Sequence, residues 1–165
     1  MIDEFNSQEK LDRLFKQAKL YHPDNAYLIA YSTWPTSAVI LGGAGTAMTR
    51  DVDSAYGGYL VSIGESRLHL LPLSKRNTKS GISSASRMSL ADGKPVVLEK
   101  KNIESVKIYP ANGLSFSTKS VTIKMNNGKK YVWLVNKQEK ALPYHQKGYA
   151  ALQSLSKSVG TKTFQ

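Results

Sequence analysis

The chain has 165 residues, of which 41% are hydrophobic, 21% charged and 9% aromatic, a composition typical of one globular domain. It contains no cysteine, which excludes disulfides, cysteine-ligated zinc, iron–sulfur clusters and thiol catalysis. The net charge of +11 is uneven, because residues 1–65 hold five basic and eight acidic side chains whereas residues 66–165 hold eighteen and four. The basic part favours an anionic partner (a membrane surface, nucleic acid or an acidic protein), although a solvated lysine-rich face fits the charge equally well.

The sequence predicts no membrane-spanning helix and no secretory signal. Its longest uncharged, largely apolar run is Ser37–Thr49, thirteen residues, whereas about 20 are needed to cross a bilayer. Asp3 and Glu4 stand where a secretory signal has positive charge. We therefore expect a cytoplasmic protein that associates at most peripherally with the inner membrane surface.

The first predicted element is an amphipathic helix within residues 1–25. Ser7 is its expected N-cap, and His22-Pro23 is expected to end it. Its apolar stripe follows helical spacing and comprises Leu11, Leu14, Phe15, Ala18 and Tyr21. Such a stripe can serve a partner or a membrane, but it is more often packed on its own domain, and we expect the latter.

From Ala26 the pattern becomes that of short strands separated by turn residues. The predicted strands are Ala26–Thr33, Tyr59–Ile63, Arg67–Leu73, Val96–Leu98, Ser105–Tyr109, Leu114–Ser117, Ser120–Met125 and Lys130–Val135. Helical period returns in Pro143–Val159, with Gly160 as the expected stop. We expect one domain over residues 26–160 and a disordered tail over 161–165.

Two loops deserve separate interpretation. The glycines at 42, 43 and 45 lack the Lys-Ser/Thr of a P-loop and the third glycine of a dinucleotide fingerprint, so a nucleotide loop is not favoured. Ser74–Pro95 is rich in serine, contains Lys75, Arg76 and Lys79, and has little to bury. We expect it to be a mobile loop.

The last hairpin admits two registers around Asn127-Gly128. A two-residue turn pairs 124 with 131 and 122 with 133, which places Tyr131 and Trp133 outward beside Lys119, Lys124 and Lys129 as an aromatic-basic surface. A three-residue turn shifts the pairing by one residue and sends both aromatic side chains into the core. Asn-Gly slightly favours the two-residue turn.

Three stretches carry a resemblance to a known family: GYLVSIGESRLHLLPL (Gly58–Leu73), VLEKKNIESVKI (Val97–Ile108) and the hairpin Ser120–Val135. In their order, over roughly residues 26–159, the chain resembles bacterial pleckstrin-homology-like (PH-like) and GRAM domains. The resemblance implies a mainly β fold, a seven-strand bent antiparallel barrel capped by a C-terminal helix, here with an extra N-terminal helix. It also implies a binding or adaptor module rather than an enzyme. The loop 34–57 holds only Arg50 as a basic residue, unlike the basic loop of phosphoinositide-binding members.

Catalytic and metal chemistry is not indicated by the spacing of the titratable residues. His22, His69 and His145 lie far apart without a metal-ligand partner, and no nucleophile, acid and base form a recognisable set. We expect no enzyme activity, cofactor or metal. The expected contacts to a partner protein or anionic lipid are Lys75, Arg76, Lys79, Lys119, Lys124, Lys129, Lys130, Tyr131 and Trp133. The alternative is a nucleic-acid-binding protein that uses the same surface.

Overall fold

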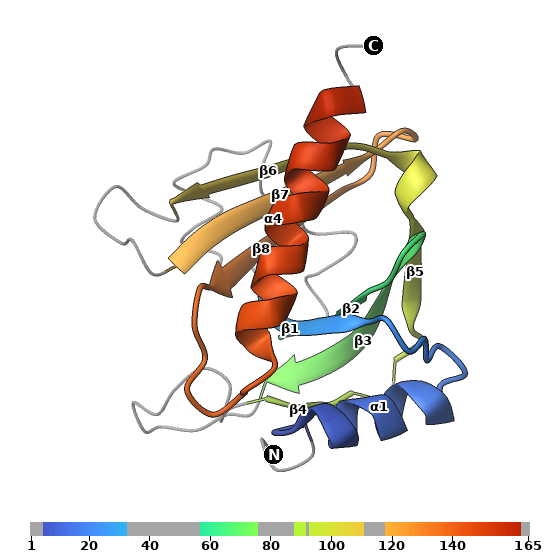
Figure 1. Cartoon of the computed structure of the whole chain (residues 1–165), viewed down its shortest axis with the longest axis vertical. Coiled ribbons are helices and arrows are strands. Elements are labelled where there is room, and N and C mark those ends of the chain that lie inside the picture. The colour runs from blue at the N-terminus through green and yellow to red at the C-terminus, as the bar shows by residue number, and fades with distance from the viewer. Residues whose placement is uncertain (1–4, 33–56, 76–87, 92, 111–117, 163–165) are drawn as a thin grey trace.

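The computed structural model describes residues 5–32, 57–75, 88–91, 93–110 and 118–162. In this part, eight strands form one antiparallel sheet of order β4-β3-β2-β1-β8-β7-β6, with β5 pairing along β3 as well (Figure 1). The fold is therefore mainly β, with an N-terminal and a C-terminal helix, as predicted. The strands are β1 Ala26–Ser32, β2 Gly58–Ile63, β3 Arg67–Lys75, β4 Met88–Leu90, β5 Val96–Glu99, β6 Ile103–Pro110, β7 Thr118–Met125 and β8 Lys130–Asn136. The helices are α1 Gln8–Gln17, the 3-10 turn η3 Lys100–Asn102, and α4 His145–Lys162.

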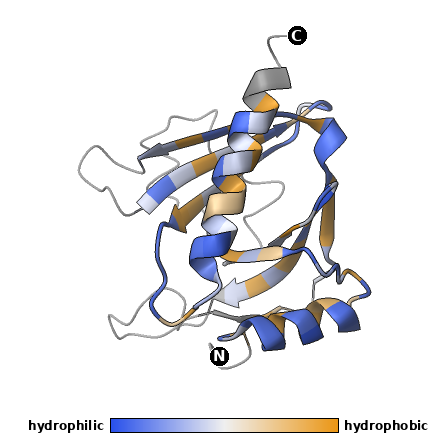
Figure 2. Cartoon of the chain, in the orientation of Figure 1, coloured by the Kyte–Doolittle hydropathy of each residue, from blue (hydrophilic) through white to orange (hydrophobic). Residues whose placement is uncertain are grey.

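Two apolar cores lie on opposite faces of the sheet. The larger, here the inner core, joins Tyr149, Leu152 and Leu155 of α4 to strands from both ends of the sheet. The second, here the α1 core, joins Leu11 and Phe15 to the other face of β1, β2 and β3. Figure 2 shows the ribbon of α1 with hydrophobic residues interspersed among hydrophilic ones, as its amphipathic pattern predicts. Leu11 and Phe15 of α1 thus pack against residues of β1, β2 and β3.

Helix α4 approaches β1 so closely that one position admits no side chain. A Cβ atom built on Gly148 would lie 1.8 Å from the carbonyl oxygen of Tyr27 and 2.9 Å from Cβ of Leu28. Glycine is therefore required for this helix to rest on the strand.

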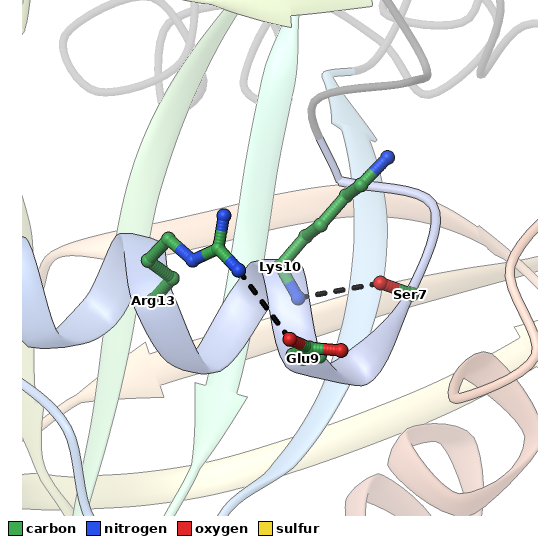
Figure 3. Close-up of polar contacts among 4 residues, drawn as sticks. All are labelled: Ser7, Glu9, Lys10 and Arg13. Atoms are coloured by element: carbon green, nitrogen blue, oxygen red, sulfur yellow. Dashed lines mark hydrogen bonds and ion pairs between the residues drawn. The ribbon is translucent and has the colours of Figure 1, made fainter.

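Helix α1 begins where the sequence predicts and ends earlier. The Ser7 hydroxyl accepts a hydrogen bond from the Lys10 N–H at 3.3 Å, and Arg13 pairs with Glu9 on the exposed side (Figure 3). The helix stops at Gln17 rather than at His22-Pro23, because Lys19 adopts φ +61°. The Leu20 N–H then donates to Phe15 O and the Lys19 N–H to Lys16 O, which is the Schellman pattern.

The β7–β8 hairpin has the three-residue loop, so the favoured two-residue turn is wrong. Lys124 pairs with Lys130, Thr122 with Val132 and Val121 with Trp133. A type I′ turn needs positive φ at both Asn127 and Gly128, but only Gly128 has it, at +93°. Positive φ at the third loop position is typical of a three-residue loop.

Three boundaries differ from prediction. Met88–Leu90, placed in the predicted loop Ser74–Pro95, forms β4 on the edge of β3, and Leu90 packs against the α1 core. Strand β3 itself extends to Lys75. Helix α4 continues through Gly160 to Lys162, so the tail does not start at 161. The predicted strand 114–117, the glycines at 42–45 and the rest of the serine-rich loop (76–87) lie outside the described residues.

Candidate functional site

Five lysines gather where the β7–β8 turn meets η3. Lys124 and Lys130 are cross-strand partners and Lys129 adjoins the turn. The Asn126 N–H donates to Asn102 O at 2.8 Å, and the Asn126 side chain donates to Lys101 O at 3.4 Å. These bonds hold the turn beside η3. We call this group the lysine corner; its members are Lys100, Lys101, Lys124, Lys129 and Lys130.

One ion pair partly neutralises the lysine corner. The Lys124 ammonium lies 2.8 Å from a Glu104 carboxylate oxygen, and both side chains are about half exposed. An exposed pair of this kind is weak, so Lys124 can exchange Glu104 for a carboxylate of a partner at little cost. The corner therefore retains cationic character.

A groove opens next to the lysine corner, between β5 and the β7–β8 hairpin. Its volume is about 430 Å³. Val97, Leu98, Met125 and Tyr131 provide apolar surface, and Lys129, Glu99 and three asparagines provide polar surface. Val97 is 44% exposed, which is unusual for a valine in a strand of this sheet. The groove thus places apolar surface directly beside positive charge.

The aromatic part of the predicted surface is absent. Tyr131 is 6% exposed and Trp133 is fully buried in the inner core, where the rings of Tyr59 and Tyr131 lie 6.3 Å from that of Trp133. The register of the hairpin is the cause, since it pairs Trp133 with the buried Val121. Tyr131 lines the groove but does not project from the surface.

The other predicted basic residues do not join the corner. Lys119 pairs with Val135 at the far end of β7, five residues from Lys124 and so on the opposite face of the strand. Lys75 ends β3, opposite Met88 of β4. Arg76 and Lys79 lie outside the described residues. Lys100, Lys101 and Val97 are not among the contact residues predicted from the sequence. The Lys-Lys pair after a short strand is visible in the sequence, but the sequence does not show that this pair lies beside the β7–β8 turn.

A larger groove of about 960 Å³ runs along α4 and ends at η3. Lys100, Lys101 and Lys147 line it together with Asp24, Glu65 and Glu99. Because charges of both signs alternate along it, this groove is less selective for an anion than the lysine corner.

A buried polar network joins β1, β8 and the start of α4. His145 Nδ1 accepts from the Ile29 N–H at 3.3 Å and Nε2 donates to Asn136 O at 2.5 Å. Glu139 accepts from the Tyr31 hydroxyl and from the Asn136 amide, both at 2.8 Å. Burial lowers the pKa of His145, against the opposing effect of its bond to Asn136. Both ring nitrogens serve backbone groups, so this histidine connects strands and offers no free base.

In the part of the chain that the structure describes, no three His, Cys, Asp or Glu side chains are grouped to hold a metal ion. No helix there is both long and apolar enough to span a bilayer. Comparison with family models, with curated proteins and with solved structures finds no match to this chain.

Proposed function

We propose that this chain is a PH-like binding module without catalysis that holds an acidic, partly apolar segment of a partner protein at the lysine corner. The observation that carries the proposal is the placement of Lys129 in the apolar groove of β5 and the β7–β8 hairpin, with Lys124 and Lys130 on the other face of the same hairpin. A segment with alternating carboxylates and apolar side chains complements both features at once.

The arrangement of strands supports the PH-like part of the proposal. Strand β1 pairs with β2 on one side and with β8 on the other, so it connects the two halves of the sheet. Helix α4 packs on β1, β2 and β6, which belong to both halves (Figure 1). A bent antiparallel sheet capped by one closing helix is the architecture that the resemblance implies.

A partner protein fits the described surface better than a membrane does. Five lysines near an anionic bilayer contribute about 5 kcal/mol, which corresponds to a dissociation constant near a millimolar. Tighter membrane binding needs an apolar anchor, yet Tyr131 and Trp133 are buried and the stripe of α1 packs into the α1 core. The same burial removes the stacking surface that a single-stranded nucleic acid would use at this corner.

The test is binding of three probes by fluorescence anisotropy or sedimentation: a short peptide of alternating glutamate and leucine, vesicles containing phosphatidylglycerol, and a single-stranded oligonucleotide. The variant K124Q/K129Q/K130Q should weaken peptide binding at least about tenfold, a loss of about 1.4 kcal/mol. The control variant K94Q/K137Q/K140Q removes the same charge from three exposed lysines elsewhere. It should leave the affinity for the peptide within about twofold of the parent protein.

V97S should weaken peptide binding without changing its salt dependence, because Val97 contributes apolar area and no charge. Equal loss in the two triple variants would contradict a defined corner. If the protein binds vesicles or the oligonucleotide but not the peptide, its ligand is a membrane or a nucleic acid and not a partner protein.

A further inference from the structure

A third, smaller pocket lies where the α1–β1 connection meets the β2–β3 turn, and the Lys100 N–H donates to Ser66 O at its edge. Its volume is about 240 Å³. Hydrogen-bond donors line it from two segments: Lys19, His22 and Asn25 from the connection, and Ser66, Arg67 and His69 from the hairpin. We call it the turn pocket. Glu65, which is exposed at the turn, is the acidic residue in the lining of the pocket.

The backbone at Lys19 is unusual for the residue it carries. Among the described residues, Lys19 is the only one other than glycine with positive φ. This conformation costs an L-residue about 1 kcal/mol or more, and glycine is its ordinary occupant. Lys19 thus lines the turn pocket from a backbone conformation that costs free energy.

The amide of Asn25 gives a second, independent observation. Asn25 is 3% exposed, and neither amide atom makes a hydrogen bond of ordinary geometry in the described part, although the amide lies close enough to the Tyr27 hydroxyl to influence its pKa. Its Oδ1 lies against the turn, 3.1 Å from a Cβ built on Gly64. His69 Nδ1 is likewise buried without such a bond. Buried polar groups left unpaired at a pocket are satisfied by a hydrogen-bonding ligand or by ordered water.

We propose that the turn pocket binds a phosphate group. Lys19 and Arg67 provide positive charge, while His22, Asn25 and Ser66 provide further hydrogen-bond donors around it. Arg67 uses its Nε to pair with Glu99 at 2.7 Å, and its guanidinium has further donors for an oxyanion. A cation is a poorer occupant, since the described part contains no group of three metal-ligating side chains.

A bound phosphate would act on the titration of His69. Burial, followed by the positive charge of Arg67, lowers the pKa of His69, while Glu99 raises it and His22 lowers it slightly. Lys19 and Glu65 are the other charged groups that line the pocket. A dianion held among them would raise the His69 pKa, because it stabilises the imidazolium.

The chain has three histidines, which makes nuclear magnetic resonance of the ring protons a direct test. Adding inorganic phosphate at constant ionic strength should shift the His22 and His69 signals with saturation and raise the His69 pKa. The His145 signals should stay in place, because that ring is fully buried in the network of β1 and α4. Chloride at the same ionic strength is the reference.

Two variants locate the effect. N25D places a carboxylate at the pocket and should abolish the saturable shift of the histidine signals by phosphate. N127D makes the same change in the exposed β7–β8 turn and should leave that shift intact. Because N25D can also impair folding, K19Q provides an exposed alternative that should weaken binding at least about threefold, with K94Q as its control. Unfolding temperature is recorded for each variant.

The source of the phosphate is separated by three probes: inorganic phosphate, glycerol phosphate and vesicles containing phosphatidic acid. Binding to vesicles alone indicates a lipid headgroup, and binding to the two small probes indicates a free phosphate compound. Signals of His69 that do not move with any probe in the folded protein, or that move equally in chloride, overturn the proposal.

Discussion

The two halves of the sheet differ in how many faces they bury. In the half made by β1, β2 and β3, the inner core covers one face and the α1 core covers the other, and all six residues of β2 are buried. In the half made by β6, β7 and β8, burial alternates along β7 from Ser120 to Met125, and Ser120, Thr122 and Lys124 occupy its partly exposed positions. The first half therefore maintains the fold, and the second leaves one face for contacts with other molecules.

The largest expected effect comes from disrupting the close contact between α4 and β1. Gly148→Ala places a Cβ atom 1.8 Å from Tyr27 O, which forces the helix away from the strand. We expect a loss of more than about 4 kcal/mol in the free energy of unfolding, measured by urea denaturation. Ala150→Gly, two positions away and exposed, should cost only about 1 kcal/mol through helix propensity. Similar losses in the two variants would contradict the close approach.

Removing the support of α1 should have the next largest effect. Phe15 is fully buried and its ring stacks on Tyr27 with centroids 5.3 Å apart. Phe15→Ala should lower the free energy of unfolding by about 3 kcal/mol. Arg13→Ala, on the exposed side of the same helix, should change it by less than about 0.5 kcal/mol. If Phe15→Ala leaves the free energy of unfolding unchanged, the α1 core adds no stability to the half of the sheet made by β1, β2 and β3.

Acid should weaken the junction between the two halves. Burial lowers the pKa of His145 below its ordinary value of 6.5, so the unfolded chain binds a proton more readily than the folded chain. The contribution of His145 is thus complete above about pH 6.5 and is lost as the pH falls toward the folded pKa. His69, whose pKa is also lowered, acts in the same direction.

The measurement is the unfolding temperature between pH 7.5 and 5.5, a range chosen to lie above the ordinary pKa values of Asp and Glu. His145→Gln should be less stable than the parent at pH 7.5 and should lose less stability on acidification. His69→Gln removes the contribution of His69 to the same slope. An unchanged slope in both variants would assign the acid sensitivity to other groups.

The difference between the halves could be anticipated in part from sequence. AYLIAYS in β1 is a nearly continuous apolar run, as expected of a strand covered on both faces, whereas TKSVTIKM in β7 alternates, as expected of a strand covered on one face. Ser7 likewise identified the start of α1 correctly.

The hairpin register and the lysine corner could not be predicted in the same way. Asn127-Gly128 suits a two-residue turn and equally the last two positions of a three-residue loop, so the dipeptide does not fix the register. The choice depends on which aromatic side chains the inner core accommodates, here Tyr131 and Trp133. Lys101 and Asn102 contact the hairpin through Asn126 because η3, between β5 and β6, lies beside it, and no sequence spacing records that contact.

A small gain in stability is expected at the end of α1. Lys19→Gly relieves the positive φ of +61°, partly offset by the greater freedom of glycine in the unfolded chain. We expect an increase of about 0.5 kcal/mol in the free energy of unfolding. Gln17→Gly, inside the same helix, should instead cost up to about 1 kcal/mol. A loss in both variants would argue against the Schellman ending.

The smallest effect should be found on the open face of the second half, at the pair of Lys124 and Glu104. Their atoms lie 2.8 Å apart, but the side chains are 41% and 49% exposed, so water screens the attraction. A double-mutant cycle with Lys124→Met and Glu104→Gln should give a coupling free energy below about 0.5 kcal/mol, decreasing with added salt. A coupling above about 1 kcal/mol would mean that Lys124 is committed to the fold. The small value expected here means that Lys124 can leave Glu104 for a partner, which is the condition under which the lysine corner can bind an acidic segment without loosening the sheet beneath it.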